Sequence, residues 1–131
     1  MSEIEFDRDH FIMVEWPEAL VSGEFKQGYG SLNRDDRFCC LGVACELLVR
    51  KGLLSRHGNG VVQYGAEGVF SDTILPYEAG RPLGISFNGA YEDEITGDIE
   101  YLTEKNDKGF SFAEIANSIK LAHGSGGWLR H

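Results

Sequence analysis

Residues 37–52 read RFCCLGVACELLVRKG, which is the longest apolar run in the chain and holds all three cysteines. Apolar side chains recur there at the spacing of one helical face; they are Cys40, Leu41, Ala44, Leu47 and Leu48. Further apolar residues widen that face, which indicates a helix covered on most sides. We therefore predict a buried helix over residues 37–52, with the rest of the chain organised around it.

The residues beside this run predict where the helix begins and ends. Asp35 and Asp36 are good N-cap residues, because a carboxylate accepts an orphan backbone N–H group. Gly52 suits the left-handed conformation that follows many helices. Gly42, in the second turn, costs up to about 1 kcal/mol relative to alanine. We expect another backbone to approach the helix closely at this glycine.

The other local patterns predict an α+β fold in which small antiparallel hairpins pack on the central helix. Helical structure is expected from about Asp9, with a break at Trp16-Pro17 and a new short helix after it. Short strands are expected at residues 61–64 and 69–70. The dipeptide Asn88-Gly89 predicts a hairpin between residues 85–87 and 90–92.

The C-terminal part predicts an αα-hairpin. Ser111 and Glu114 have the spacing of a capping box, and the helix that follows is expected to close at His123 and Gly124. A shorter helix over residues 98–105 would pair with it. We expect one domain over residues 1–123 and a flexible tail over residues 124–131.

Composition limits the classes of function. The 131-residue chain has a net charge of −9, and residues 61–100 contain eight acidic residues and one basic residue. General affinity for nucleic acid requires the opposite charge, so we expect no direct sequence-specific nucleic-acid binding. No run is long and apolar enough for a membrane span, no signal peptide is visible, and the odd cysteine count favours a reducing cytoplasm.

Cys39 is the candidate nucleophile. A thiol near a helix N-terminus has a lowered pKa, and cysteine hydrolases of the papain and NlpC/P60 type present their nucleophile in this way. Such enzymes need a histidine base within hydrogen-bond reach, for which His57 or His123 are the candidates. The alternative interpretation, which we favour, is that the cysteines are small core residues.

Other chemistry receives less support from the sequence. The cysteine spacing is not that of a zinc site, the acidic run at residues 91–94 lacks the spacing of a calcium loop, and we expect no metal and no cofactor. The pattern around Ser111 resembles the first helix of a helix-turn-helix, but no recognition helix follows. The acidic run is either a solvated rim or an interaction face for a basic partner, made of Glu92, Asp93, Glu94 and Asp98.

Several segments together carry a family resemblance. They are SGEFKQGYGSL at residues 22–32, RFCCLGVACELL at 37–48, Leu75-Pro76, Asn88-Gly89, and LTEKNDKGFSFAEIANSIK at 102–120. In this order they resemble a widespread family of small, uncharacterised tailed-bacteriophage and prophage proteins with an FCCLGV motif. The resemblance implies a phage origin and action in the bacterial host cytoplasm, and it brings no activity with it.

These observations lead to a functional hypothesis with two alternatives. We predict a phage-encoded, non-enzymatic binding protein that antagonises a host or defence protein or sequesters a signalling nucleotide; homo-oligomerisation is left open. A nucleotide would bind at the basic segment, with an aromatic ring stacking on the base; these residues are Tyr29, Arg34, Arg37, Trp16 and Arg56. The alternatives are a cysteine-dependent hydrolase and a virion accessory protein.

Overall fold

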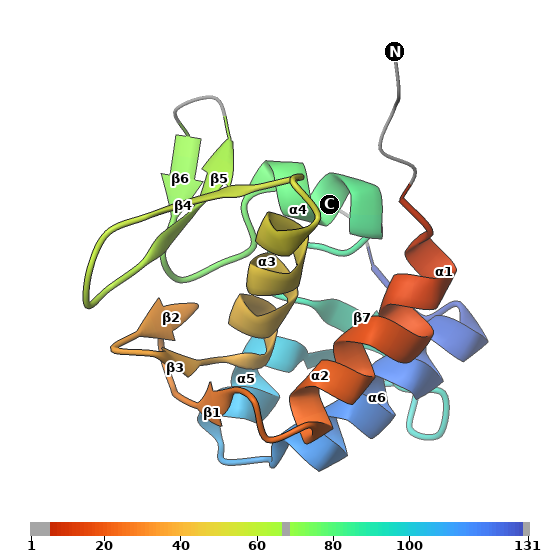
Figure 1. The fold of residues 1–131 in the computed structure, drawn as a ribbon. Coiled ribbons are helices and arrows are strands. Elements are labelled where there is room, and N and C mark those ends of the chain that lie inside the picture. Colours follow the sequence, from red (N-terminus) through yellow and green to blue (C-terminus); the bar gives the residue numbers. More distant parts are fainter. Residues whose placement is uncertain (1–5, 67–68, 130–131) are drawn as a thin grey trace.

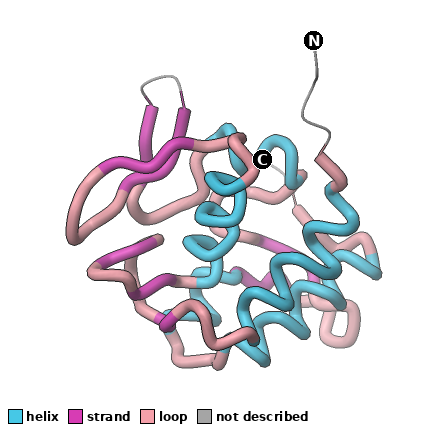
Figure 2. Tube along the Cα trace, in the orientation of Figure 1, coloured by secondary structure: helices cyan, strands magenta, loops and turns pink. Residues whose placement is uncertain are grey.

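Helix α3 (Cys40–Arg50) lies at the centre of the fold, and the other elements surround it (Figure 1). The computed structural model describes residues 6–66 and 69–129, and it has the predicted α+β class. Two small sheets lie on one side of α3, and the helices α2 (Trp16–Val21) and α6 (Phe112–Ser125) lie on the other (Figure 2).

The interior supports the predicted role of α3. Most of its residues are buried, including Cys40, Leu41 and Cys45 at 0% exposure. A Cβ atom added to Gly42 would lie 1.7 Å from the carbonyl oxygen of Leu32. The expected close backbone approach is therefore confirmed, and it explains why this helix contains a glycine.

The predicted N-cap is wrong. Cys39 is the N-cap residue, and its Sγ accepts a hydrogen bond from the Gly42 N–H at 3.4 Å. Asp35 and Asp36 have φ angles of 54° and 62° and form the two-residue loop between β2 (Asn33–Arg34) and β3 (Arg37–Phe38). Two-residue hairpin loops favour positive φ at both positions, and short polar residues tolerate it. The chain therefore reaches α3 as a strand.

The strands form three small sheets. In the first, β1 pairs in parallel with β3, and β2 pairs with β3 in the antiparallel sense. The other two sheets are antiparallel, in the orders β4-β5-β6 and β7-β8. The bounds of the remaining strands are Lys26–Gln27 for β1, Ser55–His57 for β4, Gln63–Ala66 for β5, Val69–Ser71 for β6, Ala90–Glu92 for β7 and Ile99–Tyr101 for β8.

The predicted hairpin at Asn88-Gly89 is wrong, because β7 pairs with β8 across the turn at residues 93–98. The Gly89 N–H instead donates to the Ser86 carbonyl at 3.0 Å, and this turn leads the chain into β7. A Cβ atom on Gly89 would lie 2.8 Å from the Leu102 side chain, so the glycine allows close packing against α5 (Leu102–Asp107). Strand β8 also occupies the start of the helix predicted over residues 98–105.

The expected break at Trp16-Pro17 does not occur. Helix α1 (Arg8–His10), the π-helical turn η1 (Phe11–Glu15) and α2 follow one another without a gap. The Trp16 N–H donates to the Phe11 carbonyl, five residues back. Pro17 lacks an N–H group and cannot donate the backbone hydrogen bond of an ordinary α-helix. The wider π turn just before it lets the helix continue without that bond.

The C-terminal helix and tail pack against the rest of the chain. The capping box of Ser111 and Glu114 is confirmed, but α6 continues past His123 to Ser125. Residues 124–129 do not form a free tail: the Glu92 N–H donates to the Gly127 carbonyl at 2.8 Å, and the Trp128 ring lies 5.9 Å from that of Tyr91. Residues 130–131 lie outside the described part of the chain.

Candidate functional site

The three thiols lie inside the hydrophobic core. Cys39 is 4% exposed, and Cys40 and Cys45 are fully buried. Burial raises the pKa of the Cys39 thiol to about 11, and it raises the pKa values of the other two thiols as well. A thiol in this environment stays protonated near neutral pH and is a poor nucleophile.

The structure holds the candidate histidines in other interactions. The His57 ring packs edge-on against Phe70 in the sheet β4-β5-β6, with ring centroids 4.4 Å apart. His123 Nε2 lies 2.7 Å from Asp9 Oδ1, and His123 Nδ1 accepts a hydrogen bond from Trp128 Nε1. Among residues 6–66 and 69–129, no imidazole forms a hydrogen bond with a cysteine thiol.

Asn106 is the interior residue that the sequence did not single out. It is fully buried, its Oδ1 accepts a hydrogen bond from the Cys40 N–H at 3.2 Å, and its Nδ2 donates to the Gly28 carbonyl at 2.8 Å. The next residue, Asp107, accepts a hydrogen bond from the Gly30 N–H. The Asn-Asp pair therefore joins α5 to α3 and to the loop after β1. The sequence predicts only the link of an αα-hairpin after residue 105, and that pattern gives no signal of this role.

The structure does not bring the predicted nucleotide-binding residues together. Trp16 is fully buried, and its Nε1 donates to the Cys40 carbonyl, so its ring is not available for stacking. Tyr29 and Arg34 are exposed, but neither lines the cleft that Arg37 and Arg56 share. The four basic residues of that cleft are matched by four acidic ones; the lining charges are Lys26, Arg37, Arg50, Arg56, Glu24, Asp35, Asp36 and Glu46.

Ion pairs already occupy two of the cleft arginines. Arg50 pairs with Glu24, and Arg56 donates to both oxygens of the buried Glu46 at 3.0 and 3.1 Å. The Tyr64 hydroxyl donates to Glu46 at 2.8 Å and accepts a hydrogen bond from Asn33 at 3.1 Å. This cleft is therefore a charge-balanced network of ion pairs and hydrogen bonds.

The predicted acidic face, in contrast, lies on one ordered turn. Asp93 Oδ1 accepts hydrogen bonds from the backbone N–H groups of Ile95 at 2.8 Å and Thr96 at 3.1 Å, and these bonds lower the pKa of Asp93. The Asp93 N–H donates to the Asp98 carbonyl at 2.9 Å, which closes the turn. Glu92, Glu94 and Asp98 are exposed, and none of them forms an ion pair with a described basic residue.

Exposed apolar side chains accompany these carboxylates. Ile95 is 88% exposed at the tip of the turn, and Leu121 on α6 is 56% exposed. Between them is a groove of about 110 Å³, lined by β7, the turn and α6. Its residues are Tyr91, Glu92, Asp93, Glu94, Ile95, Ser118, Leu121, Ala122 and Ser125, with no basic side chain among them. We name this surface the acidic groove.

The comparison with protein families gives one match. The model of a domain of unknown function, DUF8296, matches residues 9–123. The chain belongs to this family. The DUF8296 match includes α3, the turn at residues 93–98 and most of α6. The cysteine-rich interior and all of the acidic groove except Ser125 therefore lie within the matched residues. Neither the curated proteins nor the solved structures gave a match.

In the part of the chain that the structure describes, no three histidine, cysteine, aspartate or glutamate side chains come together as a metal site. None of the helices in residues 6–66 and 69–129 is long and apolar enough to cross a bilayer.

Proposed function

We propose that the protein is a non-enzymatic binding protein, encoded by a tailed phage or prophage, that antagonises a host or anti-phage defence protein in the host cytoplasm. The FCCLGV-type segments supply the proposed origin. The acidic groove supplies the proposed mode of action, which is the docking of a basic, partly apolar segment of the target.

The observation that carries this proposal is the isoleucine at the tip of the turn. A large apolar side chain at 88% exposure contributes nothing to the core. Four backbone and side-chain hydrogen bonds made by Asp93 fix the turn that carries it. Binding residues are commonly placed on loops that a rigid scaffold holds in position.

The charge of the groove specifies the partner. Exposed carboxylates beside an apolar contact favour lysine or arginine next to an apolar side chain on the target. The lowered pKa of Asp93 keeps that carboxylate ionised. A second copy of the chain is disfavoured as occupant, because a symmetric contact would place like charges opposite one another.

Capture of the target protein from a host lysate tests whether it binds at the acidic groove. We compare tagged wild-type protein with the double variant Ile95→Ala/Glu94→Gln and with a matched control, Val21→Ala/Glu18→Gln. Val21 is 57% exposed and Glu18 is exposed, both on α2. We expect a captured protein that the control retains, the double variant loses, and higher salt weakens. Equal capture by both variants would contradict the proposal.

The hydrolase alternative has its own test, which is the rate of thiol alkylation. We expect all three cysteines to react slowly at neutral pH and to react readily after unfolding, because each is buried with a raised pKa. Rapid labelling of Cys39 in the folded protein would favour the enzyme. Presence of the protein in purified virions would favour the accessory-protein alternative.

A further inference from the structure

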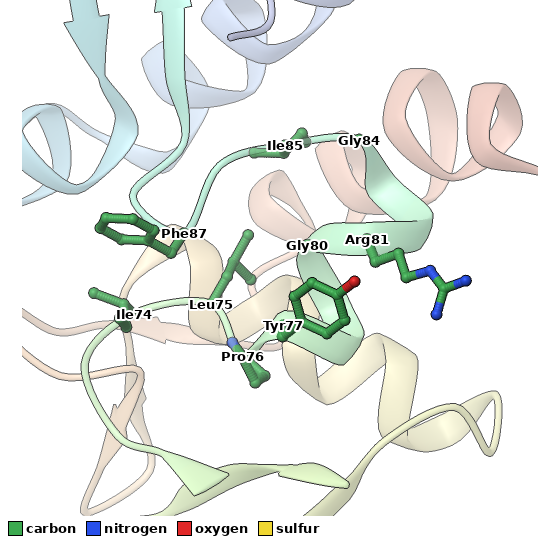
Figure 3. A pocket seen from close by; sticks show the side chains of 9 residues that line it. All are labelled: Ile74, Leu75, Pro76, Tyr77, Gly80, Arg81, Gly84, Ile85 and Phe87. Carbon is green, nitrogen blue, oxygen red and sulfur yellow. The ribbon is translucent and has the colours of Figure 1, made fainter. Parts of the chain in front are cut away.

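A second open site lies on the other side of the fold, around α4 (Tyr77–Leu83). Here a pocket of about 390 Å³ opens between α4 and the segments on either side of it. Figure 3 shows the side chains of Ile74 and Phe87 on one side of this pocket and those of Tyr77 and Arg81 on the other. None of these residues belongs to the acidic groove.

The pocket has a buried floor and an exposed apolar rim. Leu75 and Ile85 are 2% and 4% exposed and belong to the core. Ile74, Tyr77 and Phe87 are 39%, 66% and 42% exposed, although all three are large apolar or aromatic residues. Core residues thus continue into a set of apolar side chains that water still reaches, which is typical of a ligand pocket.

Hydrogen bonds fix the pocket walls. The Leu75 N–H donates to the Phe87 carbonyl at 2.8 Å, which joins the two segments beside α4. The Ile85 N–H donates to the Gly80 carbonyl at 3.2 Å and closes the end of the helix. Arg8 Nε donates to the Leu83 carbonyl, which attaches α4 to α1. A ligand would therefore enter a preformed site with little ordering of the chain.

Arg81 gives the pocket its polarity. It is the only lysine or arginine among residues 61–100, which otherwise carry eight acidic residues. It lines the pocket, is exposed, and forms no ion pair with any described acidic residue, including Glu78 one helical turn earlier. Figure 3 shows the Arg81 side chain extending away from Phe87 and Leu75, so that its guanidinium lies toward the outer end of the pocket. A guanidinium with free donors at the outer end of an apolar cavity is suited to bind a carboxylate through two parallel hydrogen bonds.

We propose that this pocket binds a small monoanion, namely a carboxylic acid with an aromatic or branched aliphatic body. The apolar body would contact Tyr77, and the carboxylate would accept hydrogen bonds from Arg81 at the outer end of the pocket. A volume of about 390 Å³ lies near the lower end of the range for small-molecule sites, about 300–1,000 Å³, so it suits one or two rings. One arginine on a chain of net charge −9 suits a single negative charge.

Titration with a matched series of probes tests the proposal. The probes are 3-phenylpropionate, its uncharged amide and the corresponding amine, followed by ¹⁵N–¹H NMR of the full chain. We expect saturable shifts at residues 74–77 and 85–87. The acid should bind at least about tenfold more tightly than the amine, a difference of about 1.4 kcal/mol. Inorganic phosphate should not compete, because it lacks an apolar body.

Two variants separate the contributions of charge and ring. Arg81→Gln should remove the preference for the acid over the amide while leaving binding of the amide within about twofold, because the apolar contacts remain. Tyr77→Ala should lower the affinity of the protein for all three probes. Arg34→Gln is the matched control, since Arg34 is exposed but lies outside the pocket, and it should change nothing.

Several outcomes would overturn the proposal. They are no saturable shift at the pocket for any probe, equal affinity for acid and amine, competition by phosphate alone, or shifts at Arg37 and Arg56 instead. Occupation by a protein segment or a second copy, seen as line broadening at the pocket without any probe, would also overturn it. Variants of the acidic groove leave this site unchanged, so the two proposals fail independently.

Discussion

The N-terminal end of α3 and the acidic groove are both organised by one side chain that accepts backbone hydrogen bonds, but they use it in opposite ways. Buried Asn106 accepts from the Cys40 N–H and attaches a helix to the core. Asp93 accepts from the Ile95 and Thr96 N–H groups and holds an isoleucine in water. The first arrangement stabilises the fold, whereas the second fixes a surface that the fold does not need.

We expect the function of this protein to lie on its surface and not in its cysteine-rich interior. The most distinctive segment of the chain is largely buried, its three cysteines most completely, and it serves packing. The two surfaces for which we propose binding lie at the turn of residues 93–98 and at α4 with the segments on either side of it, residues 74–87. Substitutions should therefore affect stability at α3 and binding at the surfaces, with little overlap.

The largest effect is expected for Gly42→Ala. The added Cβ would lie 1.7 Å from a backbone oxygen, so α3 must move away from Leu32. We expect a loss of more than about 3 kcal/mol in the free energy of unfolding, measured in urea. Gly124→Ala in α6 is the control, because its Cβ meets nothing within 4 Å, and it should gain up to about 1 kcal/mol. A similar change in the free energy of unfolding for both variants would contradict the close backbone approach as the reason for a glycine at position 42.

The next effect is expected for Asn106→Ala. It leaves the Gly28 carbonyl and the Cys40 N–H without their partner in a buried site, which should cost about 2–4 kcal/mol. Asn117→Ala, at an exposed position of α6, should change stability by less than about 0.5 kcal/mol. Urea unfolding of both variants measures the difference. An equally mild effect for Asn106 would show that water replaces its hydrogen bonds.

A smaller effect is expected from alkaline pH. The pKa of Cys39 is about 11 in the folded protein against 9.0 for a free thiol, so the unfolded chain loses this proton first. Stability is therefore complete below about pH 9 and falls as the pH rises toward 11. Cys39 alone should account for about 1.4 kcal/mol between pH 7 and pH 10. Urea unfolding of Cys39→Ala should show a correspondingly smaller loss, and an unchanged loss would place this thiol in contact with solvent.

The smallest effect on stability is expected for Ile95→Ala. With 88% of its side chain exposed, truncation should change the free energy of unfolding by less than about 0.5 kcal/mol, as measured in urea, while capture of the partner is lost. A loss above about 1 kcal/mol would mean that this side chain packs on the protein in solution. The contrast between the two regions would then be weaker than the structure indicates.

Local patterns predicted some elements well. The capping box at Ser111 and Glu114 and the close approach at Gly42 depend on neighbouring residues or on a helix period, and both are present. The acidic face was predicted as a composition, and the structure places all four of its residues in one turn and its flanking strand. Ile95 was missed, although an apolar residue inside an acidic run is a visible signal.

Other predictions were wrong because strands pair with residues outside the local pattern. Asn88-Gly89 has the preferred residues of a tight hairpin, but Ala90 pairs with Tyr101 because that register packs Leu102 against Gly89. Asp35 and Asp36 are good helix caps in isolation, yet the pairing of β2 with β3 places them at a strand turn. In both cases the local sequence does not show that strand pairing outweighs the local preference.

The sequence by itself determined the central helix, the close backbone approach at its glycine, the capped C-terminal helix and the distribution of charge. These features depend on periodicity, backbone freedom and composition. Only the tertiary structure decided that Cys39 is the N-cap of α3, that Asn106 joins three elements, and that Arg81 stands beside an apolar pocket. Each of these depends on contacts between residues far apart in the chain, which form only when the core excludes water.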